Sequence, residues 1–272
     1  MEIRDAVVII TGASGGIGLA TARACAGAGA RVALVARSAD ALNQLADDLR
    51  GEGHDALALP ADVTDRAAVD RVVDEVDRRY GRIDILVNNA GQTAVGPVAE
   101  VDPDDVRTIV ELNIFGPLYM IQAVVPRMRA RGGGLIVDVS SMVTRMTIPG
   151  IGAYTATKQA LNALSDAARV ELAPDNIRVV SVFPGRTATA FGQNALGDPA
   201  ARPQGGPGAP PDSAEKVAGK TLEAIRDEPP EKYMDDGATG RLRPGRGRRA
   251  ARRTKALAMD DRDRVHGASP RF

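Results

Sequence analysis

Tyr154 and Lys158 stand four residues apart at the start of a segment, 154–164, whose pattern predicts a helix. This spacing places both side chains on one face of that helix. A phenol with its ordinary pKa of about 10 exchanges protons poorly at neutral pH, and a nearby ammonium lowers that pKa. We therefore interpret the pair as a candidate acid/base centre. Chance could also produce the spacing, with a solvated tyrosine beside a solvated lysine.

A glycine-rich segment follows the first apolar run of the chain. Residues 7–10 read Val-Val-Ile-Ile, which is typical of a buried parallel strand, and 11–18 read Thr-Gly-Ala-Ser-Gly-Gly-Ile-Gly. An alanine-rich helix is expected over 19–29. A strand, a glycine turn and a helix N-terminus together form a phosphate site, because the backbone N–H groups can approach the anion closely. The alternative is a tight turn without a ligand.

The ordered motifs of this chain resemble those of the short-chain dehydrogenase/reductase superfamily, in its branch of single compact domains. They are Thr11-Gly-x-x-x-Gly16-Ile-Gly18, Asn88-Asn89-Ala90-Gly91, Asn113, Ser141, Tyr154-x-x-x-Lys158 and Pro184-Gly185. The resemblance covers residues 3–192 closely and the rest loosely. Medium-chain dehydrogenases carry G-x-G-x-x-G instead, so the glycine spacing favours the short-chain branch.

The resemblance implies a catalytic set of Asn113, Ser141, Tyr154 and Lys158. In that family Tyr154 would exchange the proton, while Lys158 would tune it and bind ribose. The Ser141 hydroxyl would donate to the substrate carbonyl oxygen and stabilise developing charge. Asn113, a poor helix former in a helix disturbed by Gly116-Pro117, would hold a water that links Lys158 to solvent. We therefore expect hydride transfer that interconverts a carbonyl and a secondary alcohol.

The expected cofactor is NADP(H), preferred over NAD(H). An NAD binder usually places Asp or Glu at the end of the second strand, where this chain has Arg37. Arginine is suited to the 2′-phosphate through its bidentate fork, and Ser38 adds a hydroxyl donor. Many similar NADP enzymes carry a second basic residue in the glycine loop, where this chain has Gly15. A solvated Arg37 at the strand end is the alternative.

Further ligand contacts are expected where strands end. Besides Arg37 and Ser38, the cofactor set is Gly12, Ser14, Gly16, Ile17, Gly18, Asp62, Val63, Asn89, Ala90, Gly91, Tyr154, Lys158, Pro184, Gly185, Thr187 and Thr189. Asp62 could equally cap the helix beginning near Thr64. The substrate pocket is expected to include Gln92, Met142, Val143, Arg145, Arg186 and Phe191.

Apolar strand-like runs alternate with amphipathic helices along the chain. The strand candidates are 7–10, 31–36, 56–60, 83–88, 134–140 and 177–183. This alternation predicts an α/β fold, a doubly wound Rossmann-type parallel sheet with helices on both faces and strand order 3-2-1-4-5-6. A helix over 213–225 and a short seventh strand over 231–234 are also expected. The motifs fall at strand ends, which places the chemistry in one crevice.

We expect one oxidoreductase domain over residues 1–239, with a Gly/Pro/Ala-rich substrate lid over about 190–212. The lid segment could equally be disordered. Residues 240–272 hold eleven Arg or Lys against three Asp, and form a basic C-terminal extension. That extension is either solvated and flexible or an interaction arm for phosphate-rich partners.

Composition excludes several other classes of function. Acidic and basic residues balance at 35 each, so we do not expect nucleic acid as a partner. Cys25 is expected to be a packed residue, and with two histidines we expect no metal site. We find no signal-peptide pattern and no run of 18 apolar residues, and expect a cytoplasmic homodimer or homotetramer acting on a small molecule without a membrane. The alternative is a dinucleotide-sensing protein whose tail contacts nucleic acid or a partner; a sensor would not need all four catalytic residues.

Overall fold

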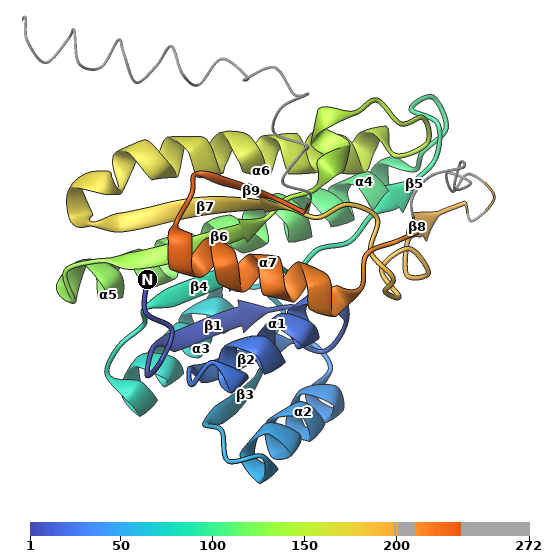
Figure 1. The fold of residues 1–272 in the computed structure, drawn as a ribbon. Coiled ribbons are helices and arrows are strands. Elements are labelled where there is room, and N and C mark those ends of the chain that lie inside the picture. The colour runs from blue at the N-terminus through green and yellow to red at the C-terminus, as the bar shows by residue number, and fades with distance from the viewer. Residues whose placement is uncertain (199, 201–209, 235–272) are drawn as a thin grey trace, which may run out of the picture. The chain divides into compact units, whose positions relative to one another are not determined.

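The central sheet has seven parallel strands in the order β3-β2-β1-β4-β6-β7-β9 (Figure 1). Their bounds are β1 Val7–Thr11, β2 Arg31–Ala36, β3 Ala56–Pro60, β4 Ile85–Asn88, β6 Gly134–Val139, β7 Ile177–Phe183 and β9 Glu231–Tyr233. The order confirms the predicted 3-2-1-4-5-6 arrangement and adds the predicted seventh strand. This computed structural model describes residues 1–198, 200 and 210–234; the basic extension and much of the lid's second half lie outside these residues.

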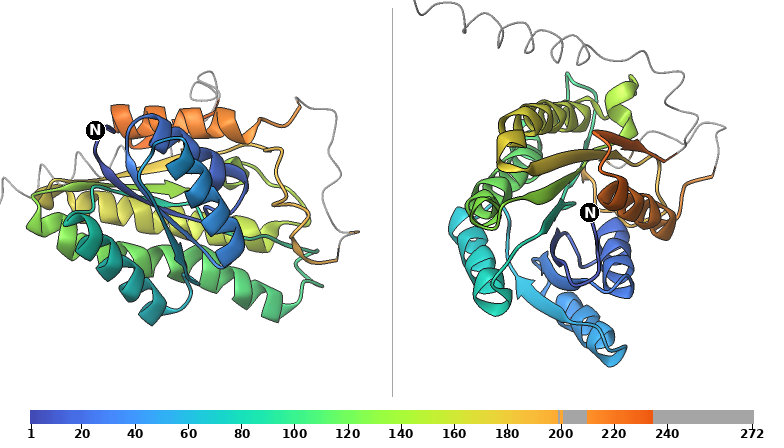
Figure 2. Two further views of the ribbon diagram at one scale, coloured as in Figure 1. Left: turned by 90° about the horizontal axis from the view of Figure 1, so that it is seen from below. Right: turned by 60° about the vertical axis from the view of Figure 1, so that its left-hand side comes forward.

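Helices cover both faces of the sheet, as the right-hand view of Figure 2 shows. The α-helices are α1 Gly16–Gly27, α2 Ala39–Gly51, α3 Arg66–Tyr80, α4 Pro103–Val110, α5 Gly116–Ala130, α6 Gly152–Glu171 and α7 Ala214–Asp227. Short 3₁₀ turns are η2 Met142–Arg145 and η3 Ala173–Asp175. One apolar core lies between the sheet and α1, α2 and α7, and a second lies between the sheet and α3 and α5.

The strand β1 shows why these residues form a central strand. All its residues are buried, with Val8 and Ile10 in the core beneath α1 and Val7 and Ile9 in the core beneath α3. Side chains of a strand alternate between its two faces, so a continuous apolar run supplies both cores. The sequence pattern and the layer architecture therefore agree.

A π-helical turn, η1 Glu111–Phe115, separates α4 from α5. It lies where the sequence predicts a disturbance, next to Gly116, whose missing side chain leaves room for Val63: a Cβ there would lie 2.9 Å from Val63 Cγ2. By length and composition alone, the 28-residue helical run Pro103–Ala130 could cross a membrane, because an 18-residue window within it has a mean hydropathy of 1.4. Of that window, 44% is buried, and side chains such as Met120 pack in the core beneath α3 and α5.

A two-stranded ladder stands apart from the main sheet, between β5 Ala94–Val95 and β8 Leu196–Gly197. It joins the segment after β4 to the first part of the predicted lid. The backbone N–H of Leu196 also donates to the carbonyl of Thr93 (2.9 Å). The lid segment up to Gly197 is therefore fastened beside the carboxyl end of β4.

Candidate active site

Tyr154 and Ser141 lie together where β6 ends and α6 begins. Both are buried, with 8% and 9% of their surfaces exposed. Ser141 caps η2, and its hydroxyl accepts from the N–H of Val143 (3.3 Å). Burial raises the pKa of Tyr154 to about 12, and hydrogen bonding with the Ser141 hydroxyl acts in the lowering direction. The two hydroxyl groups can therefore address one substrate oxygen.

Lys158 is buried one helical turn after Tyr154, and its Nζ donates to the carbonyl of Val139 (2.9 Å). Burial lowers the pKa of Lys158 to about 8, against which Asp138 acts to raise it. The sequence led us to expect that Lys158 lowers the pKa of Tyr154. In this structure burial of the phenol outweighs any such effect, because the pKa of Tyr154 stands above its ordinary value.

Asn113 joins this group through the π-helical turn. It is fully buried, and its Oδ1 accepts from the backbone N–H of Gln92 (2.9 Å) while its Nδ2 donates to the Gln92 carbonyl (2.8 Å). The Nδ2 also donates to the Thr157 hydroxyl (3.0 Å), which donates to the Tyr154 carbonyl (2.8 Å). A Cβ on Gly91 would lie 3.1 Å from Asn113 Oδ1 and 3.4 Å from Lys158 Nζ, so glycine leaves room for both.

The glycine loop between β1 and α1 forms a tight cradle. Gly12 has a φ of 68°, and a Cβ on it would lie 2.8 Å from Asn89 Nδ2. A Cβ on Gly18 would overlap the carbonyl oxygen of Gly12. The first N–H groups of α1 have no partners within their own helix, and they point toward an anion bound at its N-terminus. The cradle therefore fits the pyrophosphate of a dinucleotide.

The turn after β4 holds that cradle in place. The Thr11 hydroxyl accepts from the backbone N–H groups of Asn89 and Ala90 (3.0 Å each), and Asn89 Nδ2 donates to the Thr11 carbonyl (2.9 Å). Asn88 Nδ2 donates to Asp138 across to β6 (2.9 Å). These contacts join β1, β4 and β6 at their carboxyl ends.

The segment after β7 closes the other side of the cradle. The Thr189 side chain lies against Gly16, where a Cβ would lie 3.1 Å from Thr189 Cγ2. The Thr187 hydroxyl donates to the Gly185 carbonyl (3.2 Å), and Met142 N–H donates to the Pro184 carbonyl (2.9 Å). The ends of β6 and β7 and the glycine loop are thus brought together. Ser14 and Ile17, both half-buried, belong to the same loop and helix start.

At the end of β2, Arg37 is exposed and has no hydrogen bond or ion pair to any residue that the structure describes. Ser38 stands at the N-cap of α2, yet its hydroxyl makes no cap hydrogen bond. Both side chains are therefore available to a ligand. Asp62 accepts at Oδ1 from the N–H and the hydroxyl of Thr64 (2.9 and 2.8 Å), while the cap of α3 is Asp65, so the alternative helix-cap role falls to Asp65.

The predicted substrate side brings apolar groups to Tyr154. The ring of Phe191, from the lid segment, lies 5.7 Å from the Tyr154 ring. Tyr154 also belongs to a small apolar cluster that includes Val143, Ala94, Ile109 and Leu196. Gln92 Nε2 donates to the Asn194 carbonyl (2.9 Å). Val143 and Phe191 thus lie beside Tyr154, and Gln92 contacts the lid segment; Met142 is half-buried and Arg186 is exposed.

Arg145 does not fit the predicted substrate pocket. Its guanidinium pairs with Glu231 (2.6 Å) and lies over the rings of Phe183 and Tyr233, 5.0 and 6.0 Å from their centroids. The cation is taken up by the edge strand β9 because two aromatic faces and a carboxylate meet there. We correct this assignment: Arg145 fastens β9.

Sequence reasoning missed Thr157, Ile109 and the β5–β8 ladder. Thr157 follows Tyr154 by three residues, so its helical spacing could have placed it beside the phenol. Two-residue strands leave no periodic signal.

Among the residues that the structure describes, no cluster of His, Cys, Asp and Glu could hold a metal ion. A cavity of about 360 Å³ beside Arg50 and Tyr80 lies at the amino end of β3, the opposite end of the sheet from Tyr154.

Comparison with known sequences identifies relatives over most of the chain. A profile of the short chain dehydrogenase family matches residues 6–199. Dehydrogenase/reductase SDR family member 7B of Bos taurus is 35% identical over 200 residues, which cover 71% of this chain and 62% of the relative. Glycine betaine reductase ATRR of Emericella nidulans is 41% identical over 183 residues, 67% of this chain and 14% of that protein. The chain spans less than two thirds of the length of these relatives.

Solved structures agree with that match. A short-chain dehydrogenase from Streptomyces avermitilis is 34% identical, with a TM-score of 0.76 over 97% of this chain and 99% of its own. An alcohol dehydrogenase from Thermococcus sibiricus, complexed with 5-hydroxy-NADP, is 30% identical, with a TM-score of 0.74 over 85% of this chain and 96% of its own. With its parallel sheet, its glycine cradle and these matches, the chain belongs to the short-chain dehydrogenase family of oxidoreductases.

Proposed function

We propose that the protein is an NADP(H)-dependent oxidoreductase that interconverts a carbonyl and a secondary alcohol. The observation that carries this proposal is the convergence of Asn113, Ser141, Tyr154 and Lys158 at the carboxyl ends of β4 and β6. Family membership supports an oxidoreductase, and it gives no support to the alternative of a dinucleotide sensor. The bound nicotinamide would supply or accept the hydride.

The chain's own residues move the proton and orient the substrate. The Ser141 hydroxyl donates to the carbonyl oxygen and holds it beside the Tyr154 phenol. Tyr154 gives its proton to that oxygen during reduction and takes it back during oxidation. Lys158 is protonated below a pH of about 8 and provides a buried positive charge one turn away. Asn113 is fixed by hydrogen bonds with Gln92 and Thr157. In this position it would hold the water that links Lys158 to solvent.

Preference for NADP(H) over NAD(H) is supported by Arg37 and Ser38. Arg37 makes no hydrogen bond or ion pair, and Ser38 makes no cap hydrogen bond, within the part of the chain that the structure describes. An exposed guanidinium and a hydroxyl at the end of β2 fit an additional phosphate, because arginine binds phosphate in a bidentate manner. A carboxylate, which would repel that phosphate, is absent at this position. The glycine cradle would hold the pyrophosphate.

The substrate side supports a carbonyl compound with an apolar substituent. Phe191 and Val143 lie beside Tyr154 with other apolar residues. The alcohol dehydrogenase from Thermococcus sibiricus and the glycine betaine reductase differ widely in substrate by name, so the substrate class needs a direct screen. We also propose that the protein is cytoplasmic and forms a homodimer or homotetramer. Light scattering would test the oligomeric state.

The decisive experiment follows NADPH oxidation at 340 nm over a panel of apolar ketones, quinones and acyl thioesters. We expect turnover with at least one class, and loss of that turnover in Ser141→Ala. The matched control is Ser140→Ala, because Ser140 bonds Asn162 (2.5 Å) instead of Tyr154. Turnover that survives Ser141→Ala unchanged would contradict the proposed site.

A further inference from the structure

A carboxylate is buried beneath the candidate active site. Asp138 is fully buried on β6, one residue before Val139, whose carbonyl accepts from Lys158 Nζ. Its Oδ1 accepts from Asn88 Nδ2 (2.9 Å) and its Oδ2 from the Ser165 hydroxyl (2.6 Å). A buried carboxylate is costly unless it is hydrogen-bonded and accompanied by a positive charge. The burial of the Asp138 carboxylate therefore costs free energy of folding, which its two hydrogen bonds offset in part.

Asp138 and Lys158 lie in the same layer. Strand side chains alternate, and on β6 Val137 and Val139 face the core beneath α1, so Asp138 faces α6. Lys158 and Ser165 are seven residues apart on α6, which places them on one face of the helix, and Ser165 contacts Asp138. Both side chains are thus enclosed between β6 and α6: Asp138 has no exposed surface and Lys158 has 4%.

We propose that Asp138 is a positioning residue of the reaction, whose buried carboxylate keeps the Lys158 ammonium protonated beside Tyr154. The role of Asp138 in the reaction rests on the proposed function. Its effect on Lys158 rests on the placement of both side chains between β6 and α6. Burial lowers the pKa of Lys158 and the charge of Asp138 raises it. Burial raises the pKa of Asp138 above its ordinary value, because it outweighs the lowering by the hydrogen bonds of Asp138 and by the charges of Lys158 and Arg169. Each charge therefore stabilises the other.

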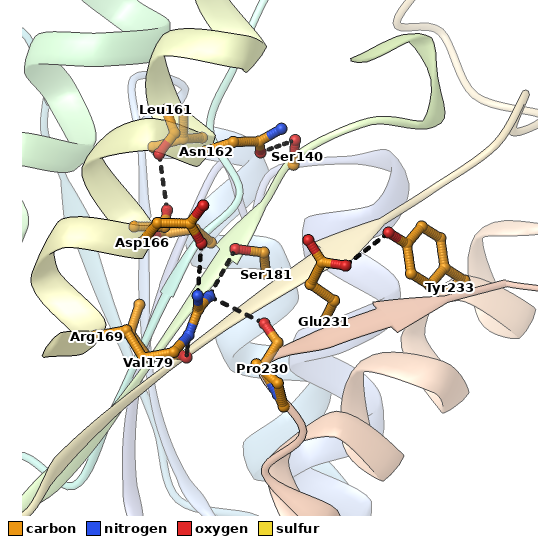
Figure 3. Close-up of polar contacts among 12 residues, drawn as sticks. Ser140, Leu161, Asn162, Asp166, Arg169, Val179, Ser181, Pro230, Glu231 and Tyr233 are labelled. Carbon is orange, nitrogen blue, oxygen red and sulfur yellow. Dashed lines mark hydrogen bonds and ion pairs between the residues drawn. The ribbon is translucent and has the colours of Figure 1, made fainter. Parts of the chain in front are cut away.

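The other groups that face Asp138 do not replace this partner. Asn88 from β4 and Ser181, its register partner on β7, are uncharged. Arg169, also on α6, is the second cation, and Figure 3 shows its guanidinium committed elsewhere. It pairs with Asp166 (2.5 Å) and donates to the carbonyls of Val179 (2.8 Å) and Pro230 (3.0 Å). Arg169 fastens α6 to β7 and the segment before β9.

The test measures the protonation of Lys158 directly, in the full chain without cofactor. The lysines are Lys158, Lys216, Lys220, Lys232 and Lys255. With lysine labelled by ¹³C at Cε, the resonance lost in Lys158→Arg identifies Lys158, and its shift is followed by NMR from acid to alkaline pH. We expect a midpoint of about 8 in the unchanged protein. In Asp138→Asn, an isosteric change that removes the charge, the midpoint should fall by roughly one to three pH units.

A second variant covers the case in which Asp138→Asn fails to fold. Ser165→Ala removes one hydrogen bond to the carboxylate, which raises the pKa of Asp138 and should lower the Lys158 midpoint by a smaller amount. Thr221→Val is the matched control. Ser165 and Thr221 are both fully buried, and each hydroxyl donates to the carbonyl four residues earlier, but Thr221 lies on α7. An unchanged Lys158 midpoint in Asp138→Asn, or in Ser165→Ala when only that variant folds, would overturn the proposal.

An activity measurement then connects this charge to catalysis. In Asp138→Asn, the loss of NADPH-dependent reduction with rising pH should begin at a lower pH than in the unchanged protein, and activity should recover below the Lys158 midpoint measured for that variant. A purely structural defect would lower activity equally at every pH. If no carbonyl substrate is turned over by any form of the protein, the proposed function fails, whereas the NMR midpoint still decides whether Asp138 holds the proton on Lys158.

Discussion

Gln92 and Asn113 hold one another by a reciprocal pair of hydrogen bonds between the Gln92 backbone and the Asn113 side-chain amide. The side chain of Gln92 extends in the other direction and donates to the Asn194 carbonyl of the lid segment. One residue therefore connects a proposed catalytic group with the cover over Tyr154. This link gives the lid a fixed position relative to Asn113.

Replacing Gln92 should loosen the lid while leaving Asn113 in place, because only the backbone of Gln92 binds Asn113. In Gln92→Ala one hydrogen bond of about 0.5–1.5 kcal/mol is lost, so KM should rise roughly two- to tenfold with little change in kcat. Steady-state kinetics on the best substrate would measure this. Gln44→Ala is the control, since the Gln44 side chain donates to Asp48 on the exposed side of α2. An unchanged KM would mean that the lid does not depend on this bond.

Tyr154→Phe should remove the proton that the reaction needs while keeping the ring that contacts Phe191. We expect turnover to fall by ~10²–10⁴-fold, with NADPH binding nearly unchanged. Cofactor titration by nicotinamide fluorescence and initial-rate measurement separate the two quantities. Near-normal turnover in the phenylalanine variant would exclude Tyr154 as the acid/base.

Arg37→Ala should reduce the preference for NADPH. Loss of a charge-assisted contact to the 2′-phosphate is worth about 1.5–3 kcal/mol, or roughly ten- to a hundredfold in NADPH affinity, and NADH affinity should stay the same. Arg71→Ala, on the exposed side of α3 with 72% of that side chain exposed, is the control. Equal binding of NADH and NADPH to the unchanged protein would contradict the role of Arg37.

Two glycines of α1 should respond in opposite ways to alanine. Gly18→Ala places a methyl group onto the Gly12 carbonyl and 2.5 Å from Asn89 Nδ2, so the loop must shift. We expect a loss of about 1–3 kcal/mol in unfolding free energy, and loss of cofactor binding. Gly27→Ala meets no atom within 4 Å and should be neutral or stabilise the protein by up to ~1 kcal/mol. Urea unfolding and NADPH titration of both variants would measure these effects.

The sheet order and the glycine cradle could be predicted because they depend on local patterns. The mostly apolar run Val7–Thr11 predicts a buried strand, and the glycine spacing from Gly12 to Gly18 predicts a phosphate cradle, without information about distant residues. The short strand β9 was also predictable, since it follows a capped helix that begins after Ser213. Motif order placed Ser141 and Tyr154 together, and the structure confirms that they meet.

The contacts between distant segments could not be predicted from the sequence. Arg145 is held by Glu231 and Tyr233, about ninety residues later in the chain, and no local pattern announces that pairing. The raised pKa of Tyr154 depends on how completely α6 and the lid bury the ring, which is a property of packing. Asp138 likewise reads as an ordinary polar residue in a strand until Ser165 is placed opposite it.

The π-helical turn Glu111–Phe115 makes the reaction sensitive to chain length as well as to side-chain chemistry. A π turn accommodates an additional residue relative to an α turn, and Asn113 lies at its middle. Deleting one residue of the turn, for instance Leu112, would let α4 and α5 join as one continuous α-helix and would change the direction in which the remaining residues of the turn point. A single-codon deletion would thus move the amide off Gln92 while every other catalytic side chain remained encoded.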